Sequence, residues 1–185
     1  KKPTTPNQQG GSKERGIINT EVPEFKADTP ASALVIGISS YPNLPSDAQL
    51  RYAHSDAQAV RDFLVSEKGG FRSEDVKLLL NEEATQDQIW REIGILQERT
   101  GPGSLALIFF AGHGFVNKSN QAFLIASDTK AGDLHATGID MHTLNSTVQN
   151  MRARSVVIIT DACHSGTLGD FLRAGPLENI SAKYF

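Results

Sequence analysis

The sequence of 185 residues contains a single cysteine, Cys163. One cysteine excludes an internal disulfide framework, and it equally excludes a zinc site built from several cysteines. A lone cysteine is most often a small buried hydrophobic residue rather than a reactive group. A chemical role for Cys163 therefore has to be supported by where it lies and by what surrounds it.

Long apolar runs are lacking as well, and so is a strong excess of charge of either sign. No apolar run approaches the roughly 20 residues that a membrane-spanning helix needs, and no signal-peptide pattern follows the N-terminal lysines. The net charge is −3, from 18 basic and 21 acidic residues, which gives no basis for binding nucleic acid or a membrane surface. We therefore expect a cytoplasmic protein that binds neither.

The length suits one domain with a substantial core and is short for two. Residues 1–30 carry four prolines, a Gly-Gly pair and few apolar side chains, which is typical of a flexible segment. We predict a flexible N-terminal lead-in over residues 1–30 and one domain over residues 31–185. Part of the lead-in could still pack on the domain through Ile17, Ile18, Val22 and Phe25.

From residue 31 onward, short apolar runs alternate with amphipathic patterns. Runs that are typical of strands buried on both faces cover residues 33–39, 75–80, 104–111 and 154–162, and a shorter strand is predicted at 121–127. Helical spacing indicates helices near residues 53–64 and 144–151, and Thr85 with Gln88 forms a capping box that opens another helix. This alternation predicts an α/β fold with a mostly parallel sheet covered on both faces.

Unusual sequences follow three of the four buried runs. The first run leads into SSYPNLP, the third ends in AGHGF and the fourth ends in DACHSG. In open α/β sheets the functional crevice lies at the carboxyl ends of the strands. We therefore expect a site where these strands end.

His113 and Cys163 are the candidate reactive residues at these strand ends. Glycines on both sides of His113 remove side-chain bulk and permit unusual backbone angles, although a turn carrying an ordinary histidine is the alternative. Neighbouring parallel strands would bring His113 close to Cys163, which follows 50 residues later (163 minus 113). His164 adjoins the cysteine, but adjacent residues of an extended chain point to opposite faces, so we do not expect it to be the base.

Two acids accompany these residues. Asp161 lies two residues before Cys163 and should share its face of an extended segment. Asp56 falls on the inward side of the first predicted helix, where a carboxylate needs a partner. The alternative for Asp56 is an acid in the first helical turn, favoured by the helix dipole, with Ser55 as the cap. The residues alone leave both interpretations of Asp56 open.

The motifs AGHG and DACHSG together resemble the caspase-like cysteine peptidases, and especially their metacaspase and bacterial orthocaspase branch. The resemblance extends from about Ala33 to Gly166. It implies a caspase-like three-layer α/β/α fold and a Cys-His dyad that hydrolyses peptide bonds. Cys163 would be the nucleophile and His113 the acid and base, and the N–H groups of Gly114 and Cys163 would bind the oxyanion. No third residue that would orient His113 is evident.

The same resemblance implies what the enzyme cuts. In metacaspases, acids that match Asp56 and Asp161 line the pocket for an arginine or lysine side chain of the polypeptide substrate. We therefore predict cleavage after Arg or Lys and not after Asp. The chain departs from the family at Ala111, where a serine is frequent, so one pocket hydroxyl is missing.

The chemistry implied by the resemblance requires no cofactor, but several metacaspases need calcium for activation. Asp128, Asp140 and Asp170 lie near positions that supply calcium ligands in those relatives. Ile139 breaks the acidic pair of the family, and calcium takes about six to eight oxygen ligands. Ordinary surface or capping acids are therefore the favoured alternative, and no metal ligand is assigned.

In this family the sheet continues after the cysteine with two strands from a small-subunit region. The chain ends at Phe185, so we expect a sheet that is incomplete on the small-subunit side, with the edge of its last strand open. A small-subunit region or a separate chain would complete it, and an unusual minimal form of the fold is the alternative. Cleavage after Arg173 or Lys183 would generate such a processed form.

Two other functions compete with a cysteine endopeptidase. A catalytically silent caspase-like module would bind partners or act as a scaffold, but silent relatives commonly lose the Cys or the His, and this chain keeps both. A metal-binding protein would use His113, His135, His142, His164 and Asp161. These histidines lack a recurring ligand spacing, which disfavours a metal site.

Overall fold

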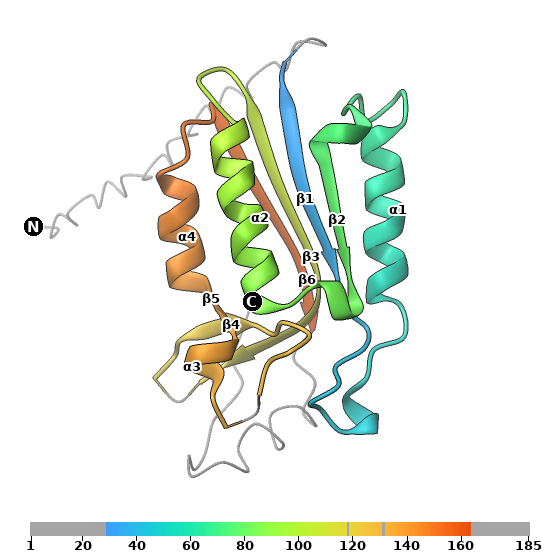
Figure 1. Cartoon of the computed structure of the whole chain (residues 1–185), viewed down its shortest axis with the longest axis vertical. Coiled ribbons are helices and arrows are strands. Elements are labelled where there is room, and N and C mark those ends of the chain that lie inside the picture. Colours follow the sequence, from blue (N-terminus) through green and yellow to red (C-terminus); the bar gives the residue numbers. More distant parts are fainter. Residues whose placement is uncertain (1–28, 118, 131, 164–185) are drawn as a thin grey trace, which may run out of the picture.

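The computed structural model describes residues 29–117, 119–130 and 132–163. They form a sheet with α1 (Ala53–Val65) on one face and with α2 (Gln86–Arg99) and α4 (Met141–Gln149) on the other (Figure 1). This is the predicted three-layer α/β/α arrangement. No helix in the described part of the chain is long and apolar enough to cross a membrane. The predicted lead-in lies almost wholly outside the described residues.

The parallel part of the sheet has the spatial order β2–β1–β3–β6. These strands are β1 (Ala31–Gly37), β2 (Val76–Leu80), β3 (Leu105–Val116) and β6 (Ser155–Cys163). The strands predicted from the buried apolar runs are therefore confirmed. β3 continues to Val116 instead of ending at its predicted boundary, residue 111.

The extension of β3 belongs to a second, antiparallel set of strands. It pairs with β4 (Ala122–Leu124), which in turn pairs with β5 (Ile139–Asp140). The AGHG sequence therefore lies inside a continuous strand, and the alternative of a turn at this point is wrong. β4 confirms the short strand predicted at residues 121–127.

Local sequence explains how α2 begins. The Thr85 hydroxyl accepts a hydrogen bond from the Gln88 N–H, which confirms Thr85 as the cap. The Gln88 side chain donates to Glu92 instead of reaching back to Thr85. The other helical segments are short, namely α3 (Leu134–Thr137) and the 3-10 turns η1 (Ser46–Ala48), η2 (Ser73–Asp75) and η3 (Asn81–Glu83).

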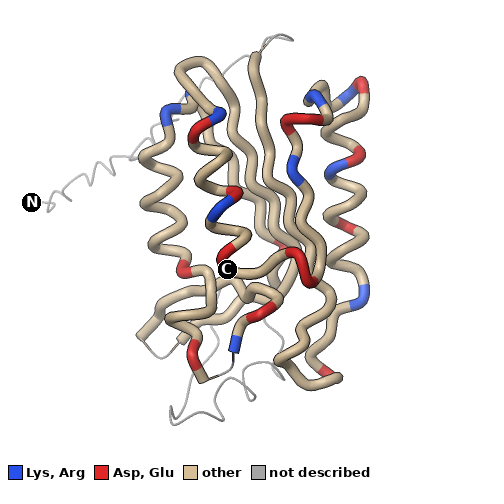
Figure 2. Tube along the Cα trace, viewed as in Figure 1, with Lys and Arg blue, Asp and Glu red and all other residues tan. Residues whose placement is uncertain are grey.

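The core has two halves, one on each face of the sheet. On the α1 side, Val35 and Phe109 pack with Ala57. On the other side, Ile36 and Phe110 pack with the apolar faces of α2 and α4. Side chains alternate between the faces along a strand and both faces are covered. This explains why β1 and β3 are almost entirely apolar and carry no Lys, Arg, Asp or Glu (Figure 2).

β6 is the open edge of the sheet among the described residues, where it pairs only with β3. Its side chains Val157 and Ile159 are 39% and 45% exposed. They are in register with Leu107 and Phe109 of β3, on the face that α1 covers over the neighbouring strands. An uncovered apolar strip therefore runs along β6, as expected for a sheet that is incomplete on this side.

Candidate functional site

The ends of β3 and β6 set the two candidate reactive residues opposite each other. In the parallel register, His113 is the partner of Cys163, and Ala111 is the partner of Asp161. Two motifs that lie 50 residues apart (163 minus 113) thus end side by side in the sheet. This is the arrangement that adjacent parallel strands were expected to produce.

His113 is buried, and a backbone carbonyl holds its ring. The residue is 1% exposed, and its Nε2 lies 2.6 Å from the carbonyl oxygen of Ala48. Because a carbonyl can only accept, Nε2 carries the proton and donates it to Ala48. In a neutral imidazole the basic nitrogen is then Nδ1. The sequence pointed to no third residue that would orient His113, and in the structure the backbone carbonyl of Ala48 holds its ring.

Tyr41 holds the main chain of His113. Its hydroxyl oxygen accepts a hydrogen bond from the His113 N–H at 2.9 Å, and the two ring centres lie 4.9 Å apart. The β1–β3 register ends at Ala111, so the tyrosine hydroxyl takes the place of a strand partner for this N–H. Burial raises the pKa of Tyr41 well above its ordinary value, so the hydroxyl stays neutral.

The partners of the His113 Nε2 and of its main-chain N–H both come from residues 41–49, which we call the histidine loop. Gln49 closes this loop: its Oε1 accepts from the Tyr41 N–H at 2.7 Å, and its Nε2 donates to the Tyr41 carbonyl at 3.0 Å. The same Nε2 donates to the Leu44 carbonyl at 3.2 Å. Gln49 thereby ties the start of the loop, which supplies the hydroxyl, to its end, which supplies the Ala48 carbonyl.

The glycines beside His113 provide space rather than backbone freedom. Neither Gly112 nor Gly114 is among the described glycines with a positive φ, so the expected unusual backbone angles are absent there. A Cβ at Gly112 would lie 2.7 Å from the Tyr41 hydroxyl and 2.9 Å from the Phe110 ring. Close packing around the histidine therefore requires glycine at position 112.

Asp56 and Asp161 line one cleft of about 170 Å³, which we call the acidic cleft. The other lining residues come from the segment that enters α1 and from β3, and they are Leu50, Arg51, Tyr52, Ala53, Ala111 and Gly112. The cleft thus adjoins the strand end that carries His113. The two acids predicted to recognise a substrate side chain lie in one place.

Asp56 is exposed, which corrects its predicted inward position. It lies in the first turn of α1, and the cap of that helix is Tyr52 rather than Ser55. The Ser55 hydroxyl donates to the Tyr52 carbonyl at 2.7 Å. A carboxylate in the first turn faces the positive end of the helix dipole and water, so Asp56 is stable there without a buried partner.

The described acids that were considered as calcium ligands cap helices. Asp128 Oδ1 accepts from the Gln86 N–H at the start of α2, at 2.9 Å. Asp140 Oδ2 accepts from the N–H and the hydroxyl of Thr143 at 3.0 and 2.6 Å. Burial alone would raise the pKa of Asp140, but the hydrogen bonds from Thr143 outweigh it and hold the pKa below its ordinary value. Asp170 lies outside the described residues.

The histidines of the metal-binding alternative are spread over different elements. His135 packs edge-on against the Phe123 ring, with the ring centres 5.2 Å apart, and the His142 N–H donates to Asp140. Across the described part of the chain, no three His, Cys, Asp or Glu side chains form a group that could hold a metal ion. His164 lies outside that part.

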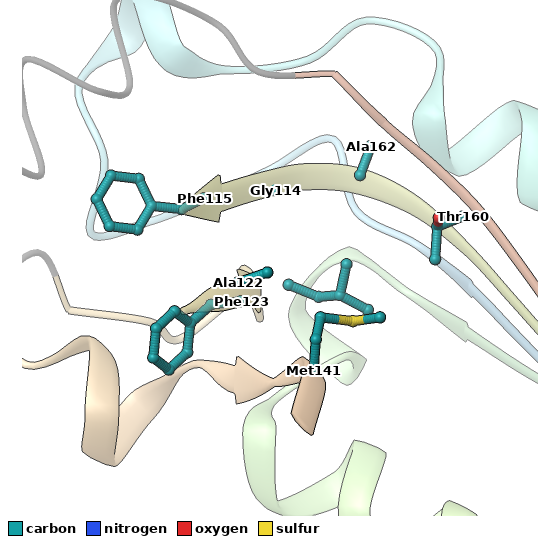
Figure 3. Close-up of a pocket in the computed structure, with 8 residues that line it drawn as sticks. Gly114, Phe115, Ala122, Phe123, Met141, Thr160 and Ala162 are labelled. Carbon is teal, nitrogen blue, oxygen red and sulfur yellow. The ribbon is translucent and has the colours of Figure 1, made fainter. Parts of the chain in front are cut away.

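A second cavity, of about 90 Å³, lies on the opposite face of the β3 and β6 ends (Figure 3). Thr160 and Ala162 line it, whereas Asp161 lines the acidic cleft, because alternate residues of a strand point to opposite faces. Its other lining residues are Gly114, Phe115, Ala122, Phe123, Leu124 and Met141. None of the described residues that line this cavity is ionisable, whereas the described lining of the acidic cleft includes Asp56 and Asp161.

Comparisons with known proteins concern the family and the fold of the domain. The family model of the caspase domain matches residues 31–180, and no curated protein matches the chain significantly in sequence. The crystal structure of a protein from Geobacter sulfurreducens is similar to 78% of this chain, with a TM-score of 0.60 and 19% sequence identity. This chain spans about half of that protein, 54% of its length, and at this identity the likeness concerns the fold alone.

Proposed function

This chain belongs to the caspase domain family, and from that premise we propose that it is a cysteine endopeptidase that cleaves polypeptides after Arg or Lys. The proposal rests on one observation above all. His113 and Cys163 are partners in the β3–β6 register, and the Nε2 of His113 is tied to the Ala48 carbonyl. A histidine held in this way has Nδ1 as its base next to the strand end that carries the only cysteine.

The proposed reaction is acyl transfer. The Cys163 thiol gives its proton to Nδ1 of His113, and the sulfur attacks the scissile carbonyl carbon. The N–H groups of Gly114 and Cys163 stabilise the resulting oxyanion, and one such donor is typically worth about 3 kcal/mol. His113 then gives the proton to the departing amine, which leaves a thioester on Cys163. Water activated by His113 hydrolyses the thioester and frees the thiol.

The acidic cleft supports the proposed preference for basic side chains. Asp56 and Asp161 both line it, and two carboxylates attract a guanidinium or ammonium group and repel a substrate aspartate. Ala111, which replaces the serine frequent in the family, lines the same cleft and adds no hydroxyl. The proposed preference agrees with the metacaspase and orthocaspase branch, which the AGHG and DACHSG motifs resemble.

The open edge of β6 supports the proposal that further strands complete the sheet. We assign this edge to a small-subunit region or a separate chain, because Val157 and Ile159 remain exposed along it. Arg173 and Lys183, outside the described residues, are the proposed sites of self-processing. Calcium activation and a cytoplasmic location stay predictions.

Hydrolysis of fluorogenic peptides that end in Arg, Lys or Asp tests the proposal. The assay uses the longest natural form of the protein, with and without calcium, and compares it with Cys163→Ala. We expect release of the fluorophore after Arg and Lys and none after Asp, because only the basic side chains complement the acidic cleft. The activity should disappear in Cys163→Ala.

Each alternative result has a defined meaning. Cleavage after Asp alone would refute the assignment of Asp56 and Asp161 to substrate recognition. Activity that survives in Cys163→Ala would refute the dyad. Absence of cleavage of every peptide, with the Cys163 thiol still reactive toward a thiol reagent, would favour the silent scaffold.

A further inference from the structure

Tyr52 is a mostly exposed residue of the acidic cleft. It lines the cleft together with Asp56 and Asp161, and it is 68% exposed. Its carbonyl accepts hydrogen bonds from the Asp56 N–H at 2.9 Å and from the Ser55 hydroxyl at 2.7 Å. The main chain of Tyr52 is therefore held against the same helical turn that carries Asp56.

The side chain of Tyr52 has no evident role in holding the fold. Among the described residues it makes no hydrogen bond and no ring contact, and α1 is capped by its main chain alone. Lone exposed aromatic residues are common on protein surfaces. Tyr52 differs from them because it is part of the lining of a cleft that also contains Asp56 and Asp161.

We propose that Tyr52 makes this cleft select arginine over lysine by offering its ring to the substrate guanidinium. Asp56 and Asp161 attract both basic side chains through their charge. The guanidinium is planar and weakly hydrated, so it stacks on an aromatic face, whereas an ammonium is compact and strongly hydrated. This inference rests on the proposed function, because it concerns the side chain that precedes the scissile bond.

Arg51 provides a matched control, because among the described residues that line the cleft it is the charged one besides Asp56 and Asp161. Its positive charge opposes the binding of a guanidinium and of an ammonium alike, since both carry a single positive charge. Removal of Arg51 should therefore improve the cleavage of both substrates by a similar factor. The ratio between them should not depend on Arg51.

The experiment measures kcat/KM for two fluorogenic peptides that differ only in Arg or Lys before the scissile bond. Tyr52→Leu should lower the Arg-to-Lys ratio about three-fold, equivalent to about 0.7 kcal/mol, chiefly through a higher KM for the Arg peptide. Tyr52→Phe should keep the ratio close to that of the wild type, because it keeps the ring. Arg51→Ala should raise both kcat/KM values and leave their ratio unchanged.

An unchanged ratio in Tyr52→Leu would overturn the inference while leaving the proposed function intact. A wild-type protein that cleaves neither peptide would instead overturn the proposed function.

A binding measurement distinguishes failure of the inference from failure of the proposed function. In the Cys163→Ala background, calorimetric titration with agmatine and with cadaverine reports affinity for a guanidinium and an ammonium without any cleavage. Tyr52→Leu should weaken agmatine binding about three-fold and leave cadaverine binding unchanged, and equal effects on both would refute the role of the ring.

Discussion

At the scale of single residues, His113 depends on a buried tyrosine hydroxyl. Tyr41→Phe removes the acceptor of the His113 N–H, and a buried donor without a partner costs about 1–3 kcal/mol. We expect the free energy of unfolding to fall by about that amount. We also expect kcat to fall more than KM rises, because His113, the proposed acid and base, shifts while the acidic cleft is untouched. Urea unfolding and steady-state kinetics measure the two effects.

Tyr52→Phe is the matched control for that change, since it deletes the same hydroxyl from an exposed tyrosine. Its hydroxyl bonds no described residue, so the free energy of unfolding should change by less than about 0.5 kcal/mol. If both substitutions alter stability equally, the hydrogen bond between Tyr41 and His113 does not stabilise the folded protein.

The support of His113 is also the part of the site that the sequence could not predict. The Ala48 carbonyl lies 65 positions from the histidine, and a backbone carbonyl is common to every residue type. Tyr41 is visible only as one letter in a loop, because its contact depends on how that loop folds back over β3. The pairing of His113 with Cys163 was predictable, because each motif follows a buried apolar run and the two runs form neighbouring parallel strands.

At the scale of secondary structure elements, the sequence predicted those strands and helix starts that depend mainly on the local sequence. Continuous apolar runs predicted the buried strands, and Thr85 predicted the start of α2. The end of β3 was placed too early because Gly112 and Gly114 are typical of a turn, whereas pairing with β6 and β4 keeps the strand extended. Asp56 was misplaced because helical periodicity did not distinguish the buried face from the exposed first turn.

The start of α4 gives a prediction about pH. Asp140→Ala should lower the free energy of unfolding by about 1 kcal/mol near neutral pH, because it removes the cap. Asp140→Asn should lose much less, since an asparagine oxygen caps about equally well. Although burial opposes the shift, hydrogen bonds hold the pKa of Asp140 below its ordinary value, so the folded state binds fewer protons than the unfolded state near pH 4. Stability is therefore lost as the pH falls through that range.

Urea unfolding near pH 7 and near pH 3 checks this prediction. The wild type should lose more stability on acidification than Asp140→Asn, whose amide does not titrate. Equal losses in the two proteins would show that Asp140 does not contribute to the acid sensitivity.

Addition of calcium to the same samples tests the other interpretation of Asp140, namely that it is a calcium ligand. A calcium-dependent rise in Tm that disappears in Asp140→Asn would assign this carboxylate to an ion.

At the scale of the whole molecule, helices α1, α2 and α4 cover the two faces of the sheet. In the described part of the chain, the outer edge of β6 has no neighbouring strand. Open strand edges pair readily with other strands, and the exposed Val157 and Ile159 add apolar area along this edge. We expect the isolated chain to self-associate through β6 when the proposed completing strands are absent. A charge in the strip should weaken that association without unfolding the domain, because both side chains already face solvent in part.

Sedimentation velocity of Ile159→Lys tests this expectation against Phe63→Lys, which introduces the same charge at another exposed apolar residue, 57% exposed on α1. Ile159→Lys should raise the dissociation constant of the associated form about tenfold or more, equivalent to about 1.4 kcal/mol. Phe63→Lys should leave it unchanged, because α1 lies away from the open edge (Figure 1). Equal weakening by both substitutions would mean that association is not directed by β6. If the wild type is monomeric at every concentration, the β6 edge is already protected. That result would contradict the proposal that further strands complete the sheet.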